Sequence, residues 1–307
     1  MSRAVMYETF GGPEVLELRE VPEPHAGTGE VRVRVAAVGL NPMDWALSSS
    51  PETAQRFGIT LPSGFATDFA GTVDEVGEGV SGFTVGDRVY GGAAGRAAAD
   101  FVVVAPSGAG TLLRTPAAIS DEVAGTLPVA GLTASAALAV IGVKAGDTVL
   151  IGGAAGGVGV FAVQLARLAG ARVIGTASEG TRDFLRGLGA EPVTYGPGLE
   201  ERVREIVPDG VSAATDLFGT QTAEAALALG VPAERISTIA AGPNPPGGVR
   251  ATSGFDARPE DLNRIADAIA VGEITVPIAA AFPLEQIQEA VRLQAGRHVH
   301  GKIVINL

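Results

Sequence analysis

Hydrophobic and polar positions follow two different rhythms along the chain, and the change falls near residue 120. Before it, apolar residues gather in short β-rich runs, and the run over 30–38 alternates cleanly between apolar and polar positions, which is typical of a strand with one buried face. The runs cover residues 3–8, 15–21, 30–38, 69–73, 86–90 and 99–105, with Gly- and Pro-rich turns between them. This part of the pattern predicts a twisted, barrel-like β domain of antiparallel character.

From residue 120 onward, apolar runs of strand length alternate with stretches of helical spacing. The alternation predicts a doubly wound parallel sheet, preceded by a long helix over 120–140 that breaks near Gly131. The expected strands are 148–151, 171–176, 192–195, 212–218 and 235–240, and the expected helices are 158–169, 181–188, 199–206, 221–229 and 259–271.

The last part of the chain follows a sheet that is already complete. We therefore expect the segment 274–282, a helix over 284–295 and a strand over 302–306 to return to the first domain. The prediction is an α/β protein of two domains, one formed by residues 1–118 with 278–307 and the other by residues 119–277.

A run of small residues interrupts the apolar pattern between the expected strand 148–151 and the helix after it. Such a strand, tight turn and helix is typical of a dinucleotide-binding βαβ unit, because backbone N–H groups must approach a pyrophosphate closely. A Gly-rich loop without a ligand is the alternative that this pattern alone leaves open. The residues predicted to contact the cofactor are Ala154, Ala155, Gly156, Gly157, Val158 and Gly159.

Length and composition fit two globular domains, since the chain has 307 residues, of which 46% are hydrophobic and 18% charged. A net charge of −12 argues against nucleic acid or an anionic membrane as a partner. No apolar run reaches membrane-spanning length, and the strand pattern that starts at residue 3 leaves no room for a signal peptide. We therefore expect a cytoplasmic protein.

The chain has no cysteine and three histidines, His25, His298 and His300. The absence of cysteine excludes disulfides, thiolate metal ligands and a cysteine nucleophile. His298 and His300 could touch a metal ion, but no third ligand is evident beside them. We therefore expect no metal site.

Several separated segments, in their order along the chain, resemble the medium-chain dehydrogenase/reductase superfamily and, within it, the zinc-free quinone oxidoreductase branch. These segments are residues 39–44, 68–73, 76–80, 83–89, 131–134, 153–159 and 300–304. The resemblance implies a GroES-like β domain and a Rossmann domain, which coincides with the division predicted from periodicity. It also implies a homodimer, with the seam at residues 235–240 or 249–255.

Zinc-dependent relatives carry a cysteine at the position of Asn41 and a cysteine-rich lobe, and this chain has neither. The resemblance therefore implies hydride transfer to an acceptor that needs no metal, either a quinone or an α,β-unsaturated carbonyl compound, whose enolate a few hydrogen-bond donors can stabilise. Two alternatives stay open. One is an enoyl reductase of a biosynthetic intermediate, and the other is a non-catalytic, crystallin-like NADPH-binding protein.

The tip of the expected second strand of the sheet favours NADPH over NADH. NAD-binding units place Asp or Glu there, whereas this chain has Ser178, followed by Arg182. A hydroxyl group and a guanidinium suit a 2′-phosphate, and the resemblance implies a further contact from Tyr195. Glu179 is the counter-evidence, since it could grip the ribose of NAD. Arg182 could also be a solvated surface charge, and Tyr195 a packing residue.

The resemblance implies that Asn41 and Thr133 are the catalytic residues. Asn41 would also donate a hydrogen bond to the acceptor, and Thr133 would also contact the cofactor beside the nicotinamide. For Asn41 a helix cap before Pro42 is an equally open interpretation, and for Thr133 helix packing is. Trp45 and Phe57 are expected to form walls for a flat substrate. Two residues of the matching segments remain: Asp44 is expected to be structural, while Lys302 is either a family residue of the site or a surface lysine.

Overall fold

The computed structural model describes residues 1–106, 112–242, 244–258 and 260–307. The chain forms two compact units. Unit 1 contains residues 1–129 and 278–307, and unit 2 contains residues 130–277. The first boundary between them lies after residue 129, whereas the hydrophobic pattern placed it after residue 118. The α/β fold class, a β-rich unit and a parallel-sheet unit, is confirmed.

Unit 1 is built from two sheets. A small sheet has the strand order β2-β1-β4, and a larger one has the order β15-β16-β3-β5-β6-β8, with β7 paired to β3. Apart from the parallel pair β15 and β16, the pairs are antiparallel. The strands are β1 (Ser2–Tyr7), β2 (Glu17–Val21), β3 (Val31–Leu40), β4 (Ser63–Gly64), β5 (Asp68–Val76), β6 (Arg88–Gly92), β7 (Phe101–Val104), β8 (Leu112–Arg114), β15 (Ile278–Pro283) and β16 (Lys302–Asn306).

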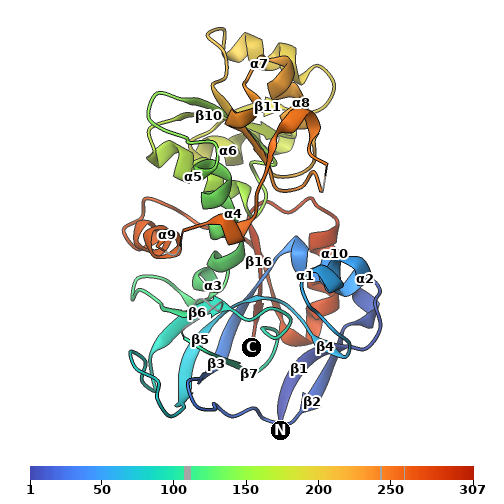
Figure 1. Ribbon diagram of the computed structural model, residues 1–307, viewed down its shortest axis with the longest axis vertical. Coiled ribbons are helices and arrows are strands. Elements are labelled where there is room, and N and C mark those ends of the chain that lie inside the picture. The colour runs from blue at the N-terminus through green and yellow to red at the C-terminus, as the bar shows by residue number, and fades with distance from the viewer. Residues whose placement is uncertain (107–111, 243, 259) are drawn as a thin grey trace. The chain divides into compact units, whose positions relative to one another are not determined.

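The last strand of the chain, β16, lies in the larger sheet of unit 1 between β15 and β3. The hydrophobic pattern predicted this return of the chain to its first domain. β16 lies beside β3 with Ile303 opposite Leu40, so the two strands join the beginning of the chain to its end (Figure 1). Both strands are buried along most of their length, because they cross the core of unit 1. This burial places the first residue of β16, Lys302, inside the unit.

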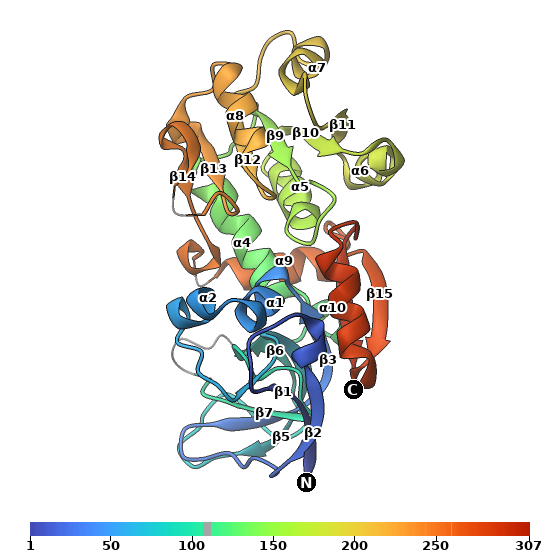
Figure 2. The ribbon, with the colours of Figure 1, turned by 90° about the vertical axis from the view of Figure 1, so that its right-hand side faces the viewer.

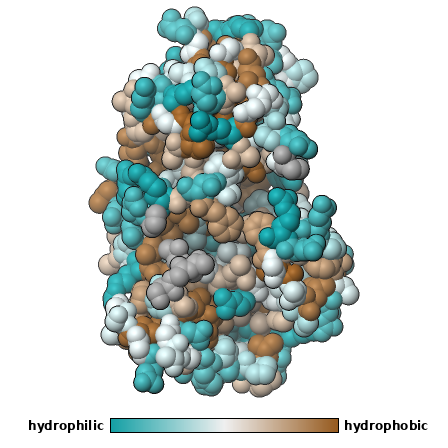
Figure 3. Space-filling model, in the orientation of Figure 1, coloured by the Kyte–Doolittle hydropathy of each residue, from teal (hydrophilic) through white to brown (hydrophobic). Residues whose placement is uncertain are grey.

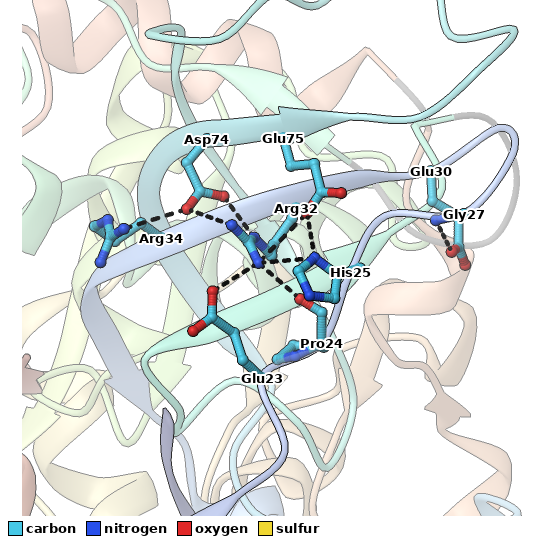
Figure 4. A network of polar contacts seen from close by, with 9 residues as sticks. All are labelled: Glu23, Pro24, His25, Gly27, Glu30, Arg32, Arg34, Asp74 and Glu75. Carbon is cyan, nitrogen blue, oxygen red and sulfur yellow. Dashed lines mark hydrogen bonds and ion pairs between the residues drawn. The ribbon is translucent and has the colours of Figure 1, made fainter. Parts of the chain in front are cut away.

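The polar face expected on the strand over 30–38 is partly buried. Arg32 is only 9% exposed, because the Pro- and Gly-rich segment before β3 folds over it. Its guanidinium donates hydrogen bonds to the carboxylates of Asp74 and Glu23, both at 2.9 Å, and to the Pro24 carbonyl (Figure 4). The ion pairs compensate the burial of the charge and attach the segment to the sheet.

Unit 2 contains a six-stranded parallel sheet with the order β11-β10-β9-β12-β13-β14, the order of a dinucleotide-binding doubly wound fold. β14 lies at the edge beside β13 (Figure 2). The strands are β9 (Thr148–Gly152), β10 (Arg172–Ala177), β11 (Glu191–Thr194), β12 (Ala213–Asp216), β13 (Ile236–Thr238) and β14 (Arg250–Ala251).

Local signals mark the ends of some of the helices. α2 starts after Ser50, whose hydroxyl oxygen accepts the N–H of Thr53 at 3.1 Å, and α6 ends at Gly189, which has a φ of 91°. The α-helices are α1 (Pro42–Ser49), α2 (Pro51–Arg56), α3 (Asp121–Ala124), α4 (Leu127–Ala139), α5 (Gly159–Leu168), α6 (Arg182–Leu188), α7 (Leu199–Ile206), α8 (Gln221–Ala228), α9 (Asp261–Ala270) and α10 (Ile287–Ala295). The 3-10 helices are η1 (Pro13–Val15), η2 (Glu179–Thr181), η3 (Ala233–Arg235), η4 (Pro246–Gly248), η5 (Gly254–Asp256) and η6 (Leu284–Gln286).

The helix expected over 120–140 breaks at a different glycine. α3 ends before Gly125, and Gly131 lies inside α4. A Cβ on Gly125 would lie 2.9 Å from the carbonyl oxygen of Ala37, so β3 approaches the chain closely at this point. The expected start of the helix over 259–271 lies outside the described residues.

Hydrophilic and hydrophobic residues are interspersed over the face of the molecule that Figure 3 shows. Among the described residues, no helix combines the length and the apolar character that crossing a membrane requires.

Gly71 of β5 tests the close approach of two strands in unit 1. A Cβ at this position would lie 2.0 Å from the carbonyl oxygen of Arg34 on β3, so Gly71→Ala forces the strands apart. We expect the substitution to destabilise the protein by about 2 kcal/mol or more, measured by thermal or urea unfolding. Gly92→Ala is the control, because its Cβ would meet only the Thr67 methyl group at 3.8 Å. Equal stability of the two variants would contradict the expectation.

Candidate functional site

The loop after β9 brings a helix N-terminus close to the backbone of the preceding strand. Gly153 has a φ of 68°, which strains any residue with a side chain. A Cβ on Gly159, the first residue of α5, would lie 2.3 Å from the Gly153 oxygen and 2.5 Å from the Ala154 carbonyl carbon. Ala154 is fully buried, while residues 155–158 are partly exposed. Two of these four residues are glycines, which leave backbone N–H groups accessible, as a pyrophosphate site requires.

A buried carboxylate that the sequence interpretation missed holds the neighbouring loop. Asp216 ends β12, which pairs with β9 so that Asp216 lies opposite Gly152. Its two oxygens accept four backbone N–H groups at 2.8–3.1 Å, from residues 218, 219, 222 and 223. An aspartate that follows an apolar strand was the available signal. Its role is structural, because these bonds order the start of α8.

Ser178, Arg182 and Tyr195 lie at the same edge of the parallel sheet of unit 2. Ser178 follows β10 and Tyr195 follows β11, and these strands pair so that Ala177 lies opposite Thr194. The Ser178 hydroxyl lies 2.6 Å from that of Thr181. Ser178, Arg182 and Tyr195 together form a polar strip at the carboxyl ends of two adjacent strands.

Within this strip, Arg182 is the first residue of α6. Within the described part of the chain its guanidinium has neither an ion pair nor a hydrogen bond, whereas Arg186 of the same helix pairs with Asp183 at 2.6 Å. Tyr195 is 54% exposed. The strip therefore has an uncompensated positive charge and an exposed phenol, while the Glu179 side chain is exposed in η2.

Asn41 forms the centre of a buried polar cluster in unit 1. Its amide nitrogen Nδ2 donates to Asp68 Oδ2 at 2.8 Å, and its Oδ1 accepts from Lys302 Nζ at 2.6 Å. The second Nδ2 hydrogen reaches only the Gly39 carbonyl, at 3.4 Å. Lys302 also donates to the Leu40 carbonyl at 3.1 Å. The amide is thus held between a carboxylate and an ammonium group.

Asp44 and Asp68 connect this cluster to neighbouring elements. Asp44 accepts the Asn41 backbone N–H at 2.8 Å, which closes the first turn of α1, and the Thr67 hydroxyl at 3.0 Å. Asp68 accepts the Val129 N–H at 3.1 Å. Asp68, Asn41 and Asp44 are 0%, 2% and 3% exposed. A structural role for Asp44 and the helix-start interpretation of Asn41 fit these contacts.

Burial dominates the titration of this cluster. It raises the pKa of Asp44 to about 6, although hydrogen bonds from Asn41 and Thr67 oppose the shift. It raises the pKa of Asp68 to about 7, against the Lys302 ammonium and the Asn41 amide. Burial also lowers the pKa of Lys302, against both carboxylates. Two carboxyl groups and one ammonium group therefore share a site in which full ionisation leaves a net negative charge.

Lys302 is 2% exposed, which rules out the surface interpretation of this residue. Asp68 escaped the sequence interpretation as a functional residue. The signal was a single acid within the apolar run from Phe65 to Val73, which on physical grounds needs a partner once buried.

The other predicted residues lie on α1 and α4 and at the end of α2. Trp45 of α1 packs on the unit 1 core, with the Arg297 guanidinium carbon 5.8 Å from its ring centroid. Phe57 is 41% exposed at the end of α2. Thr133 lies in α4 and is 9% exposed, and a Cβ on Gly254 would lie 3.1 Å from its hydroxyl. The roles predicted for these three residues stay predictions.

Within the described ranges, no three His, Asp or Glu side chains gather in a way that could hold a metal ion. The Asn41 side chain is a neutral amide, and it forms hydrogen bonds with Lys302 and Asp68.

The Asp68 carboxyl group gives a pH-dependent prediction for stability. Its folded pKa of about 7 lies above the ordinary value of 3.8, so the folded state binds the proton more tightly. The stability from this proton is complete below about pH 4 and is lost as the pH rises through 7. Asp68→Asn cannot ionise, so the melting temperature of the variant relative to wild type should increase from pH 5 to pH 8.

The control is Asp183→Asn, since the Asp183 side chain is 96% exposed. Its difference from wild type should stay constant over the same pH range. A constant difference for Asp68→Asn as well would contradict the account of the buried cluster.

Comparisons with known proteins agree with both units. Residues 27–111 match the family of the alcohol dehydrogenase GroES-like domain, and residues 188–305 match the zinc-binding dehydrogenase family. A quinone oxidoreductase of Pseudomonas aeruginosa is 33% identical over 99% of this chain and 99% of its own length.

Two solved structures extend the comparison. Escherichia coli quinone oxidoreductase, in complex with NADPH, is 27% identical with a TM-score of 0.86, covering 99% of this chain and 100% of its own. The structure named CurK enoyl reductase is 26% identical with a TM-score of 0.87, covering 99% of each chain. With its GroES-like unit, its parallel-sheet unit and a full-length relative, the chain belongs to the quinone oxidoreductase family of the medium-chain dehydrogenase/reductase superfamily.

Proposed function

We propose that this oxidoreductase uses NADPH to transfer hydride, without a metal ion, to a quinone or an α,β-unsaturated carbonyl compound. The observation that carries the proposal is the strip formed by Ser178, Arg182 and Tyr195 beside the Gly-rich loop of unit 2. The complex of the Escherichia coli relative with NADPH supports the choice of cofactor.

The residues of unit 2 fit NADPH in two places. The backbone of residues 154–159 suits the pyrophosphate, since it lies at the N-terminus of α5. Gly159 allows this tight turn, because a Cβ there would collide with the Gly153 oxygen. Arg182 can pair bidentately with a 2′-phosphate, while the Ser178 hydroxyl and the Tyr195 phenol add hydrogen bonds. Bound there, NADPH supplies the hydride. An NADH enzyme would instead use an acid such as Glu179 to bind the ribose hydroxyls.

On the acceptor side, we propose that Asn41 donates a hydrogen bond to the carbonyl oxygen, and that Thr133 lies beside the nicotinamide. Trp45 and Phe57 are proposed as apolar walls. A chain without cysteine, with Asn41 at the position where zinc relatives have one, supports metal-free chemistry. The negative charge of an enolate then has to be stabilised by hydrogen-bond donors.

An enoyl reductase of a biosynthetic intermediate is the second candidate, supported by the similarity to CurK enoyl reductase. A non-catalytic NADPH-binding protein is the third. A homodimer and a cytoplasmic location also stay predictions. Of the two predicted seams, 249–255 is the better placed, because β14 lies at the sheet edge while β13 is paired on both sides.

Removal of the free guanidinium tests the cofactor. Arg182→Ala should weaken NADPH binding about 10- to 100-fold, as expected for the loss of a charge-assisted hydrogen bond, and leave NADH binding unchanged. Fluorescence titration with both nucleotides measures this. Arg186→Ala is the matched control on the same helix, with wild-type affinity expected. Tighter NADH than NADPH binding by wild type, or unchanged NADPH affinity in Arg182→Ala, would sink the assignment.

An acceptor panel tests the reaction. NADPH oxidation at 340 nm (about the absorbance maximum of the reduced nicotinamide) is followed with benzoquinones, simple enones and enoyl thioesters. We expect turnover with the quinones or enones to exceed that with thioesters, because a reaction with a small acceptor needs no carrier-binding surface. Turnover with thioesters alone would favour the enoyl reductase, and tight NADPH binding without any turnover would favour the binding protein.

A further inference from the structure

Lys302 of unit 1 is almost completely buried, with only 2% of its surface exposed. Lys302 opens β16 and donates to Asn41 Oδ1 at 2.6 Å and to the Leu40 carbonyl at 3.1 Å. The carboxylates of Asp68 on β5 and Asp44 on α1 stabilise its positive charge by electrostatic attraction. Such a burial costs free energy that a packed apolar side chain would avoid, so the fold alone does not require an ammonium here.

The contacts fix the orientation of the Asn41 amide. An ammonium group can only donate, so Oδ1 must face Lys302, which leaves Nδ2 to face Asp68. A positive charge beside Oδ1 draws electron density from the amide nitrogen and makes its hydrogens stronger donors. The second of these hydrogens has only the 3.4 Å contact with the Gly39 carbonyl.

We propose that Lys302 is a positioning residue for hydride transfer, whose ammonium group orients and polarises the Asn41 amide as donor to the acceptor's carbonyl oxygen. The inference rests on the proposed function, in which Asn41 contacts the acceptor. In this inference the positive charge of Lys302 stabilises the reaction through Asn41, and Lys302 does not touch the substrate.

The chemistry shows when this charge matters. Hydride adds to the carbon β to the carbonyl, the π electrons move to the oxygen as an enolate, and a proton from water then joins the α carbon. A weakly electrophilic enone develops a strongly basic enolate oxygen and depends on the donor. A quinone delocalises the charge into a conjugated ring and depends on it less. Loss of the polarising charge should therefore affect the two acceptors unequally.

The test compares Lys302→Met with wild type, using NADPH with an enone such as 2-cyclohexenone and with 1,4-benzoquinone. Methionine retains length and removes the charge. We expect kcat to fall about tenfold or more for the enone, part of the effect of removing an oxyanion donor, and less than about threefold for the quinone. The NADPH dissociation constant should not change. Lys144→Met is the control, since Lys144 is the other lysine of the chain and is exposed.

Lys302→Arg, which retains the charge, should recover much of the enone rate. If Lys302→Met does not fold, Lys302→Gln carries the same expectation, because it retains a donor without the charge. Equal losses with both acceptors, or no loss with either, would overturn the inference while leaving the proposed function in place. Failure of wild type to reduce either acceptor would overturn the proposed function and the inference together.

Discussion

The energetic constraint at the centre of unit 1 is that buried charges must be compensated within the protein. Asp68 at 0% exposure and Lys302 at 2% meet this constraint through Asn41, whose amide can donate to one and accept from the other. The cluster joins β3, β5, β16 and the start of α1. Its cost is visible in the pKa of Asp68, raised to about 7 by burial. A buried charged site that is costly to form and leaves one Asn41 amide hydrogen with only a 3.4 Å contact is more readily explained by reactivity than by stability.

In unit 2, backbone N–H groups and a positive charge lie at the carboxyl ends of neighbouring parallel strands. The steric requirement falls on glycines, since a Cβ on Gly159 would collide with the Gly153 oxygen. The electrostatic requirement falls on Arg182, whose neighbour Arg186 is neutralised by Asp183. One unit thus carries the groups that suit an anionic cofactor, and the other carries the Asn41 amide that we propose as donor to a carbonyl acceptor.

Periodicity predicted the parallel sheet of unit 2 and the terminal strand of unit 1, because strands that are buried at most of their positions appear in the sequence as short apolar runs. It missed β14, which has two residues, and misplaced the break near Gly131, since the break depends on the approach of Ala37 to Gly125. The Gly-rich loop was recognisable because its chemistry is local. The pairing of Lys302 with Asn41 joins residues 261 positions apart, and no local pattern could reveal it.

The central claim is that this chain transfers hydride from NADPH to a carbon atom conjugated with a carbonyl group. It is tested most directly with NADPH that carries deuterium at both hydrogen positions of carbon 4 and with a β-substituted enone, with the product analysed by mass spectrometry and NMR. The account predicts one deuterium at the carbon β to the carbonyl and none at the α carbon, which takes its proton from water. A reduced product without deuterium at the β carbon would contradict it.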